Sequence, residues 1–132
     1  MMQDKKRPEN QTADKNKKSL GKRGEDAAAK YLASCGHEIL ARNFRCRAGE
    51  IDIVARDLND GSLVFAEVKT RRSVIFGLPC EAVTAEKRRH LRRAAETYMA
   101  YKGQMDELCR MDVLEIIAKD SKFYIRHLKN CF

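Results

Sequence analysis

Acidic and basic side chains stand inside two apolar segments of the sequence, GEIDIV and FAEVKT. Asp52 lies in the first segment, and Glu67, Val68 and Lys69 lie in the second. Two carboxylates suit phosphodiester hydrolysis because they bind Mg²⁺ or Mn²⁺, which activates water and neutralises phosphate charge. We expect Asp52 and Glu67 to be metal ligands, with the Val68 carbonyl as a further oxygen. Lys69 is the expected catalytic lysine, which orients the attacking water or neutralises charge on the phosphate.

The spacing of these residues predicts that they share one face of a β-hairpin. Side chains alternate between the two faces of a strand, so Glu67 and Lys69 point to the same side. The Asp60–Gly61 step favours a two-residue turn, which sets Asp52 opposite Lys69 and Val54 opposite Glu67. A turn with an odd residue count would separate the acids unless a bulge restored the register. A surface ladder of ion pairs is the alternative to a metal site.

Longer motifs around these residues resemble the YraN-like family of bacterial proteins, which are predicted nucleases. The similar motifs are RNFRCR, GEID, VFAEVKTR and MDV, after an early Gly-Glu pair, and they span about residues 19 to 128. The resemblance implies a restriction-endonuclease-like fold, similar to that of Holliday junction resolvases. It also implies that Asp52, Glu67 and Lys69 are catalytic, and that Glu25 is a further catalytic acid.

The expected order of helices and strands predicts an α/β fold with a mixed central sheet flanked by helices, which would position these residues. We expect a helix at 19–35, a strand at 38–44, the two site strands, a helix after Thr84, and strands at 111–118 and 123–128. The expected buried stripe of the second helix comprises Leu91, Ala94, Ala95, Tyr98 and Met99. Glu25 lies at the margin of the first helix's apolar stripe, where an ordinary surface glutamate is equally compatible with the periodicity. For Asp112 we expect structural pairing.

Basic residues gather in three places near the predicted site and indicate contacts with nucleic-acid phosphates. Arg45 and Arg47 precede the acidic strand, and Arg71 and Arg72 open a loop that follows Lys69. The first half of the second helix is crowded with positive charge, which opposes the helix dipole and would be relieved by an external anion. Its basic residues are Lys87, Arg88, Arg89, Arg92 and Arg93. A merely solvated basic surface is the alternative in each place.

The composition indicates one small domain with a polyanionic partner. The chain has 132 residues, of which 43% are hydrophobic, enough for a single core at 19–132 after a disordered basic arm at 1–18. Combined with the predicted site, a formal net charge of +8 favours a polyanionic partner, for which DNA is the expected candidate. No apolar run approaches the roughly 20 residues that cross a bilayer, so no membrane is expected. The five widely spaced cysteines are expected to stay reduced in the cytoplasm.

Together these features predict a Mg²⁺- or Mn²⁺-dependent nuclease that hydrolyses DNA. Branched or junction DNA as the substrate, and a homodimer that makes paired cuts, are implied only by the resemblance. The alternative is a nucleic-acid-binding module of the same fold that acts without catalysis beside a repair or recombination partner. RNA stays open as a substrate, although few aromatic residues are present to stack on bases.

Overall fold

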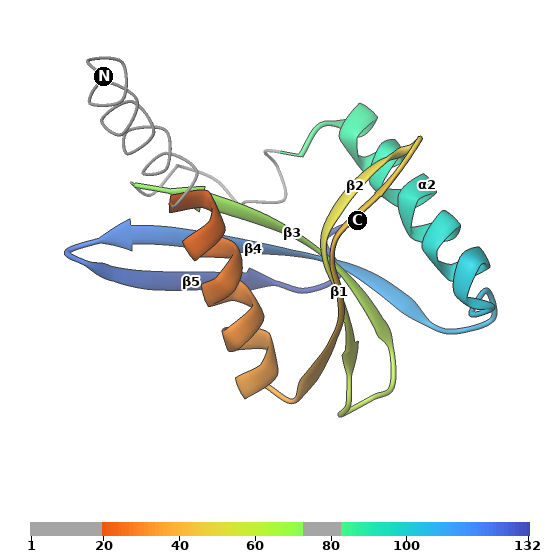
Figure 1. Ribbon diagram of the computed structural model, residues 1–132, viewed down its shortest axis with the longest axis horizontal. Helices are drawn as coiled ribbons and strands as arrows, with labels where there is room; N and C mark the ends of the chain where they lie inside the picture. Colours follow the sequence, from red (N-terminus) through yellow and green to blue (C-terminus); the bar gives the residue numbers. More distant parts are fainter. Residues whose placement is uncertain (1–19, 73–82) are drawn as a thin grey trace, which may run out of the picture.

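The computed structural model describes residues 20–72 and 83–132, so the predicted arm at 1–18 lies outside it. Within these ranges the chain forms a helix, three strands, a second helix and two more strands (Figure 1). This order confirms the predicted α/β class, and the mixed five-stranded sheet with two helices is consistent with a restriction-endonuclease-like fold. Neither helix of the described ranges combines the length and the apolar character that a membrane crossing requires.

The sheet has the strand order β1-β2-β3-β4-β5. Its strands are β1 (His37–Cys46), β2 (Gly49–Asp57), β3 (Leu63–Arg71), β4 (Cys109–Lys119) and β5 (Lys122–Leu128). Strands β3 and β4 run parallel, whereas the other neighbours are antiparallel. A parallel pair needs a crossover connection, and α2 (Ala85–Lys102) lies in that connection.

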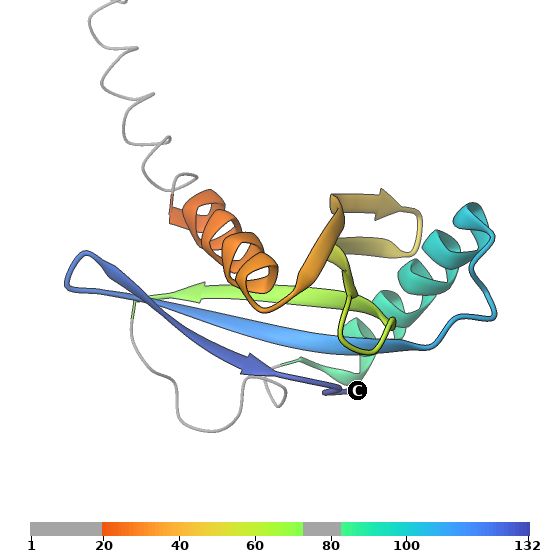
Figure 2. The same ribbon diagram turned by 90° about the horizontal axis from the view of Figure 1, so that it is seen from below.

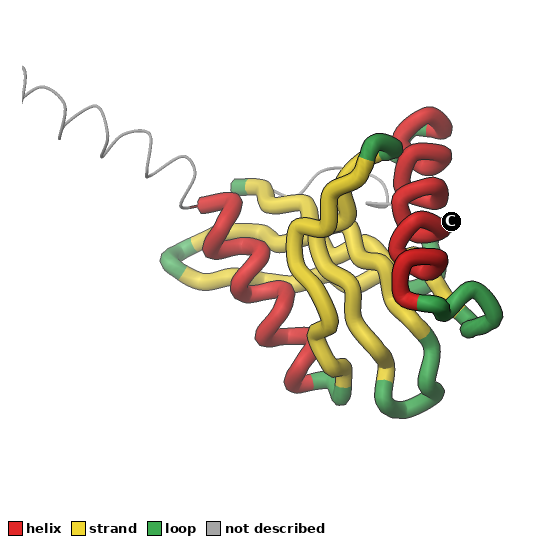
Figure 3. The backbone as a smooth tube through the Cα atoms, turned by 45° about the vertical axis from the view of Figure 1, so that its right-hand side comes forward, coloured by secondary structure: helices red, strands yellow, loops and turns green. Residues whose placement is uncertain are grey.

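The two helices pack on opposite faces of the sheet, and Figure 3 shows one at each side of the strands. The helix at residues 20–34 buries Ala28 and Leu32 against a core that includes Ile53. Helix α2 packs against Val54 and Phe65, and its buried residues are the five predicted from the sequence. Figure 2 shows the β4–β5 hairpin extending beyond the helix at 20–34.

Helix α2 begins and ends at residues that satisfy its terminal backbone groups. The Thr84 hydroxyl accepts a hydrogen bond from the backbone nitrogen of Lys87 at 3.1 Å, as expected of an N-cap. Gly103 follows the helix in the left-handed conformation, with φ of 67°, and donates its N–H to Ala100. The cap at Thr84 fixes the first turn of α2 and therefore the directions of the side chains that it carries.

The connection between β2 and β3 is longer than the predicted two-residue turn. The backbone nitrogen of Asp57 donates to the carbonyl of Ser62 at 2.9 Å, which leaves the four residues Leu58–Gly61 in the loop. The Asp57 carboxylate accepts a hydrogen bond from the backbone of Asn59, and the Asp60 carboxylate accepts one from Ser62, both at 2.9 Å. These side-chain bonds stabilise the longer loop.

The register between β2 and β3 differs from the prediction for the same reason. Val54 lies opposite Phe65, two residues away from the predicted partner Glu67, so the predicted register was wrong. The register differs from the prediction by two residues. Because side chains alternate between the two faces of a strand, a shift by an even number of residues leaves each side chain on its predicted face. Asp52 and Glu67 therefore stay on one face despite the different turn.

The cysteines only partly match the expectation of five reduced thiols. Cys35, Cys46 and Cys109 are free, and Cys80 lies outside the described residues. Cys131 is disulfide-bonded, so the expectation was wrong at that position. A disulfide requires closeness in space and no particular sequence spacing, and the absence of a Cys-x-x-Cys pair did not exclude one.

Candidate active site

Asp52 and Glu67 meet where the pairing of β2 with β3 ends. The last paired residues are Ile53 and Ala66, and the two acids are the next residue on each strand. In place of a further backbone pair, Asp52 Oδ2 accepts a hydrogen bond from the backbone nitrogen of Val68 at 2.8 Å. Both acids lie on the face that α2 covers, since residues two positions away on each strand pack against α2.

The surroundings of Asp52 make its ionisation unfavourable. Burial removes water from the carboxyl group and, together with the negative charge of Glu67, raises the pKa of Asp52 to about 7. The hydrogen bond from Val68 opposes this shift, whereas the charges of Glu25 and Glu50 add to it. A raised pKa that arises from burial and a neighbouring acid is typical of sites tuned for function. A bound cation would relieve it by stabilising the ionised carboxylates.

Glu67 is buried and contacts two lysines. Its Oε1 atom lies 3.4 Å from Lys69 Nζ and 3.1 Å from Lys87 Nζ, and only 6% of its side chain is exposed. Burial acts to lower the pKa of Lys87. The hydrogen bond to Glu67 and the nearby negative charges raise this pKa by more than burial lowers it, so the net shift is upward. Lys87 was predicted to contact nucleic acid from a basic surface, and in the structure it contacts the buried acid Glu67.

A pocket of about 220 Å³ opens between the acidic strands and α2. It is lined by Gly49, Glu50, Asp52, Glu67, Lys87, His90 and Leu91. His90 was not among the site residues predicted from the sequence. The available signal was its spacing of three residues from Lys87, which places both side chains on one side of a helix. The pocket thus has an acidic wall from the sheet and a basic wall from α2.

Glu25 approaches the same acids from the helix at residues 20–34. Burial raises the pKa of Glu25, Arg42 opposes the shift, and the charge of Glu50 adds to it. Asn43 links the two acids, because its amide nitrogen, in the orientation that satisfies both, lies 3.0 Å from Glu25 Oε1 and 3.2 Å from Glu50 Oε1. Asn43 has a φ of 54°, a backbone conformation that asparagine adopts more readily than most residues. The structure places Glu25 beside the predicted metal ligands, and its catalytic role stays a prediction.

Two contacts set the position of this helix against the strands. Gly24 faces Thr70 at the end of β3, and a Cβ atom at Gly24 would collide with the Thr70 side chain. Asp26 Oδ1 lies 2.7 Å from Arg42 Nη2 and joins the helix to β1. These contacts hold Glu25, which lies between Gly24 and Asp26, near the end of the paired strands.

The oxygen donors at this place suit a hard divalent cation that binds through few protein atoms. Among residues 20–72 and 83–132, no three or more His, Cys, Asp or Glu side chains come together as a metal cage. Mg²⁺ commonly uses one or two carboxylates and keeps several waters, a requirement that Asp52 and Glu67 meet. The Val68 amide holds Asp52 in place, and metal binding by the Val68 carbonyl stays a prediction.

The predicted nucleic-acid contacts divide into exposed and internally bound residues. Arg71 Nε lies 3.7 Å from Glu115 Oε2, and Arg88 Nε donates to the carbonyl of Val83 at 3.1 Å. Arg47 and Arg93 line a second pocket of about 530 Å³ between the β1–β2 turn and α2. The exposed members are Arg45, Arg47, Arg72, Lys87, Arg89, Arg92 and Arg93. The loop predicted directly after Lys69 was wrong for Thr70 and Arg71, which belong to β3, and most of its remainder lies outside the described residues.

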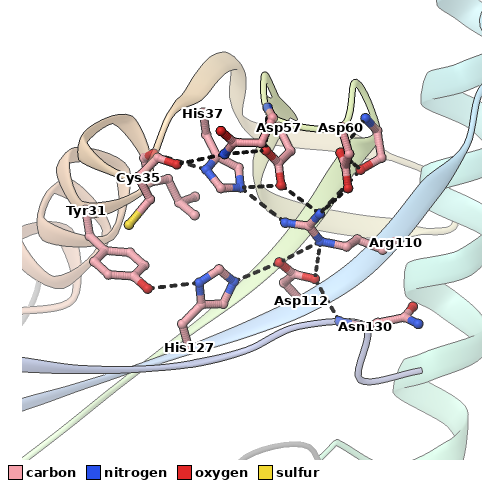
Figure 4. Close-up of polar contacts among 12 residues, drawn as sticks. Tyr31, Cys35, His37, Asp57, Asp60, Arg110, Asp112, His127 and Asn130 are labelled. Atoms are coloured by element: carbon pink, nitrogen blue, oxygen red, sulfur yellow. Dashed lines mark hydrogen bonds and ion pairs between the residues drawn. The ribbon is translucent and has the colours of Figure 1, made fainter.

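A second polar cluster lies at the opposite end of β2, around Arg110 of β4 (Figure 4). Arg110 donates hydrogen bonds to Asp57 at 2.9 Å and to Asp112 at 3.1 Å. His37 Nδ1 lies 3.2 Å from the carbonyl of Leu32, so this nitrogen carries the hydrogen and Nε2 accepts from Arg110, also at 3.2 Å. Arg110 thereby joins three strands of the sheet.

The same cluster continues from Asp112 to the helix at residues 20–34. Asp112 Oδ2 lies 2.7 Å from His127 Nε2, and His127 Nδ1 lies 3.1 Å from the Tyr31 hydroxyl. The order of acid, imidazole and hydroxyl resembles a proton relay, but Asp112 and His127 have side chains that are only 0% and 5% exposed. A substrate does not reach this imidazole, and the pairing of Asp112 is structural, as predicted. The cluster as a whole was not predicted, since its members are scattered along the sequence.

Comparison with known proteins identifies the family of the chain. A family model described as "Uncharacterised protein family UPF0102" matches residues 24–116. A UPF0102 protein of Caldicellulosiruptor saccharolyticus is 45% identical over 119 residues, which are 89% of this chain and 99% of the relative. A UPF0102 protein of Geobacter metallireducens is 48% identical over 115 residues, 87% of this chain and 93% of the relative. These matches confirm the resemblance to the YraN-like family, and the chain belongs to the uncharacterised protein family UPF0102.

Proposed function

We propose that this protein is a metal-dependent nuclease that hydrolyses DNA phosphodiester bonds. The observation that carries the proposal is the meeting of Asp52 and Glu67 at the end of the β2–β3 pairing, with the pKa of Asp52 raised to about 7. A buried glutamate and a half-buried aspartate beside a lysine suit the binding of a divalent cation, and they contribute little to the stability of a sheet.

Each residue has a defined part in the proposed reaction. Asp52 and Glu67 would hold Mg²⁺ or Mn²⁺, which would supply activation of water and stabilisation of negative charge on the phosphate. Lys69 orients the attacking water, and Glu25 helps to position the ion or the water. The water oxygen bonds to phosphorus as the bond to the leaving sugar oxygen breaks. The attacking water loses a proton to solvent, and the leaving oxygen takes one up.

The test is cleavage of labelled duplex, single-stranded and four-way-junction DNA with Mg²⁺, Mn²⁺ or EDTA. We expect metal-dependent cleavage by the wild type, and its loss in Asp52→Asn and Lys69→Ala. Asp106→Asn is the matched control, because Asp106 is exposed in the connection between α2 and β4. Full cleavage by Asp52→Asn would reject the assignment of the site. An RNA duplex in the same assay tests RNA as the alternative substrate.

The exposed arginines favour a second candidate, a nucleic-acid-binding module without catalysis. Arg89, Arg92 and Arg93 lie on the solvent side of α2, where phosphates can reach them. For this candidate, changing all three to glutamine weakens DNA binding and flattens its salt dependence, whereas Lys69→Ala changes little. Salt-sensitive binding without any metal-dependent cleavage would select this candidate over the nuclease.

The resemblance extends the proposal to branched DNA and to a homodimer that makes paired cuts. A cytoplasmic location is also proposed, from the composition of the sequence. Preference for the four-way junction over duplex DNA in the cleavage assay tests the first extension. Sedimentation of the protein alone and with junction DNA tests the second.

A further inference from the structure

The positive charge of Lys87 is unfavourable at its position in helix α2. It lies in the first turn of α2, three residues after the N-cap Thr84, where a positive side chain opposes the helix dipole. Its Nζ atom lies 3.1 Å from Glu67 Oε1, closer than Lys69 Nζ at 3.4 Å. The contact with Glu67, and not the helix, stabilises the charge of Lys87.

The two lysines contact the same carboxylate oxygen but come from different elements of the fold, and of the two only Lys87 lines the pocket. Lys69 belongs to β3, the strand that carries Glu67, whereas Lys87 arrives on α2 beside His90. The Lys87 side chain is 46% exposed, so its ammonium group touches both the buried acid and the solvent in the pocket. A phosphate that enters the pocket therefore meets Lys87 at the same place as the predicted metal ligands.

We propose that Lys87 is a second catalytic lysine of this centre, which neutralises Glu67 before metal binds and contacts the scissile phosphate once metal has replaced it. The inference rests on the proposed nuclease function and adds a residue from the crossover helix. Lys87 stabilises negative charge on a non-bridging phosphate oxygen and is not itself consumed. Because it competes with a cation for Glu67, its removal affects metal binding and cleavage in opposite directions.

That opposition separates the proposal from two simpler roles of Lys87. A lysine that only contacts the DNA surface lowers DNA affinity when it is removed, with no change in metal affinity or in the rate at saturation. A lysine that only anchors α2 lowers the stability of the protein and gives no reason for tighter metal binding. Neither role predicts a protein that binds metal more tightly and cuts more slowly.

The experiment compares wild type with Lys87→Met, Lys87→Arg and the matched control Lys102→Met. Lys102 lies in the last turn of α2, at the end opposite the pocket, and is exposed. Calorimetric titration with Mn²⁺ alone gives metal affinity, and single-turnover cleavage of duplex DNA at saturating Mn²⁺ gives the rate. For Lys87→Met we expect roughly 3- to 10-fold tighter Mn²⁺ binding and at least about tenfold slower cleavage. Lys87→Arg should recover part of the rate, and Lys102→Met should match wild type in both measurements.

The two proposals fail in different ways. Unchanged Mn²⁺ affinity in Lys87→Met overturns the role of Lys87, and so does an unchanged rate at saturation in a wild type that cuts. A wild type that does not cut, combined with tighter Mn²⁺ binding by Lys87→Met, rejects the nuclease but keeps the competition between Lys87 and metal. Absence of Mn²⁺ binding in every variant overturns both proposals.

Discussion

Asp52 Oδ2 lies 2.8 Å from the backbone nitrogen of Val68, so a side chain of β2 takes the place of a backbone partner for β3. The regular pairing of the two strands ends one residue earlier, at Ile53 and Ala66. The hydrogen bond holds the carboxyl group of Asp52 near Glu67, whose negative charge acts on it. The hydrogen bond itself acts to lower the pKa of Asp52, but burial and the charge of Glu67 outweigh it and raise this pKa to about 7.

Asp52→Asn should make the protein more stable at alkaline pH. The pKa of Asp52 is about 7 in the folded protein and roughly 3.9 in an unfolded chain, so the folded state binds the extra proton. Stability from this group therefore falls as pH rises from about 4 to about 7. Asparagine keeps an oxygen for the Val68 amide, and we expect a gain on the order of 1 to 3 kcal/mol at pH 8 and little at pH 4. Urea unfolding in EDTA at both pH values measures the difference, and an equal effect at the two would contradict it.

Gly24→Ala should destabilise the protein although alanine is the better helix former. Helix propensity alone predicts a gain of about 1 kcal/mol, whereas the collision of the new Cβ with Thr70 predicts a loss of about 1 to 3 kcal/mol. Thr70→Ala removes Oγ1 and Cγ2, the two Thr70 atoms nearest to the new Cβ, so the double variant should recover most of the lost stability. Urea unfolding of both single variants and the double variant measures the coupling. Strictly additive effects would show that the two residues do not meet.

Asn43→Ala should cost more stability than Asn43→Gly. Both changes remove the amide that links Glu25 with Glu50, but only glycine adopts a φ of 54° without a penalty. We expect alanine to be less stable than glycine by about 1 to 2 kcal/mol. Thermal unfolding of the two variants in one buffer isolates this backbone effect. Equal melting temperatures would indicate that the chain at position 43 relaxes to an ordinary strand conformation.

Asp57 should contribute to stability at neutral pH and lose that contribution in acid. Burial acts to raise the pKa of Asp57, but hydrogen bonds from Asn59 and Arg110 overcome this and lower it to about 2. Its contribution is complete above the unfolded pKa of about 3.9 and is lost as pH falls towards 2. Asp57→Asn should therefore lose about 1 to 2 kcal/mol at pH 7 and show a weaker pH dependence between 4 and 2. Urea unfolding across this range, with Asp106→Asn as control, measures it; an unchanged acid dependence would count against the Asp57–Arg110 bond.

The order of helices and strands was predictable because each element has a clear local period. The stripe from Leu91 to Met99 has helical spacing, and Thr84 is a typical N-cap. The face shared by Asp52 and Glu67 was predictable for a weaker reason, since any even change in the turn preserves it. The loop length itself depended on hydrogen bonds of Asp57 and Asp60, which a turn motif does not specify.

The contacts that were not predicted join parts of the chain that meet only after folding. Lys87 reaches Glu67 because the crossover lays the first turn of α2 beside β3, a relationship that no sequence period expresses. Arg110 and His127 belong to a cluster drawn from both ends of the chain, and its members carry no shared spacing. Burial of a charged residue such as Arg110 depends on finding all of its partners at once.

The second polar cluster, shown in Figure 4, lies at the end of β2 away from Asp52. The residues that stabilise the fold there are therefore separate from the residues of the proposed active site. A variant such as Asp52→Asn would then be an inactive protein that folds at least as well as the wild type and keeps its exposed arginines. Such a variant is suited to serve as a substrate trap, in which nucleic acid bound in a cell is recovered uncut with the protein. Sequencing the recovered strands would reveal which nucleic acid the protein engages inside the cell.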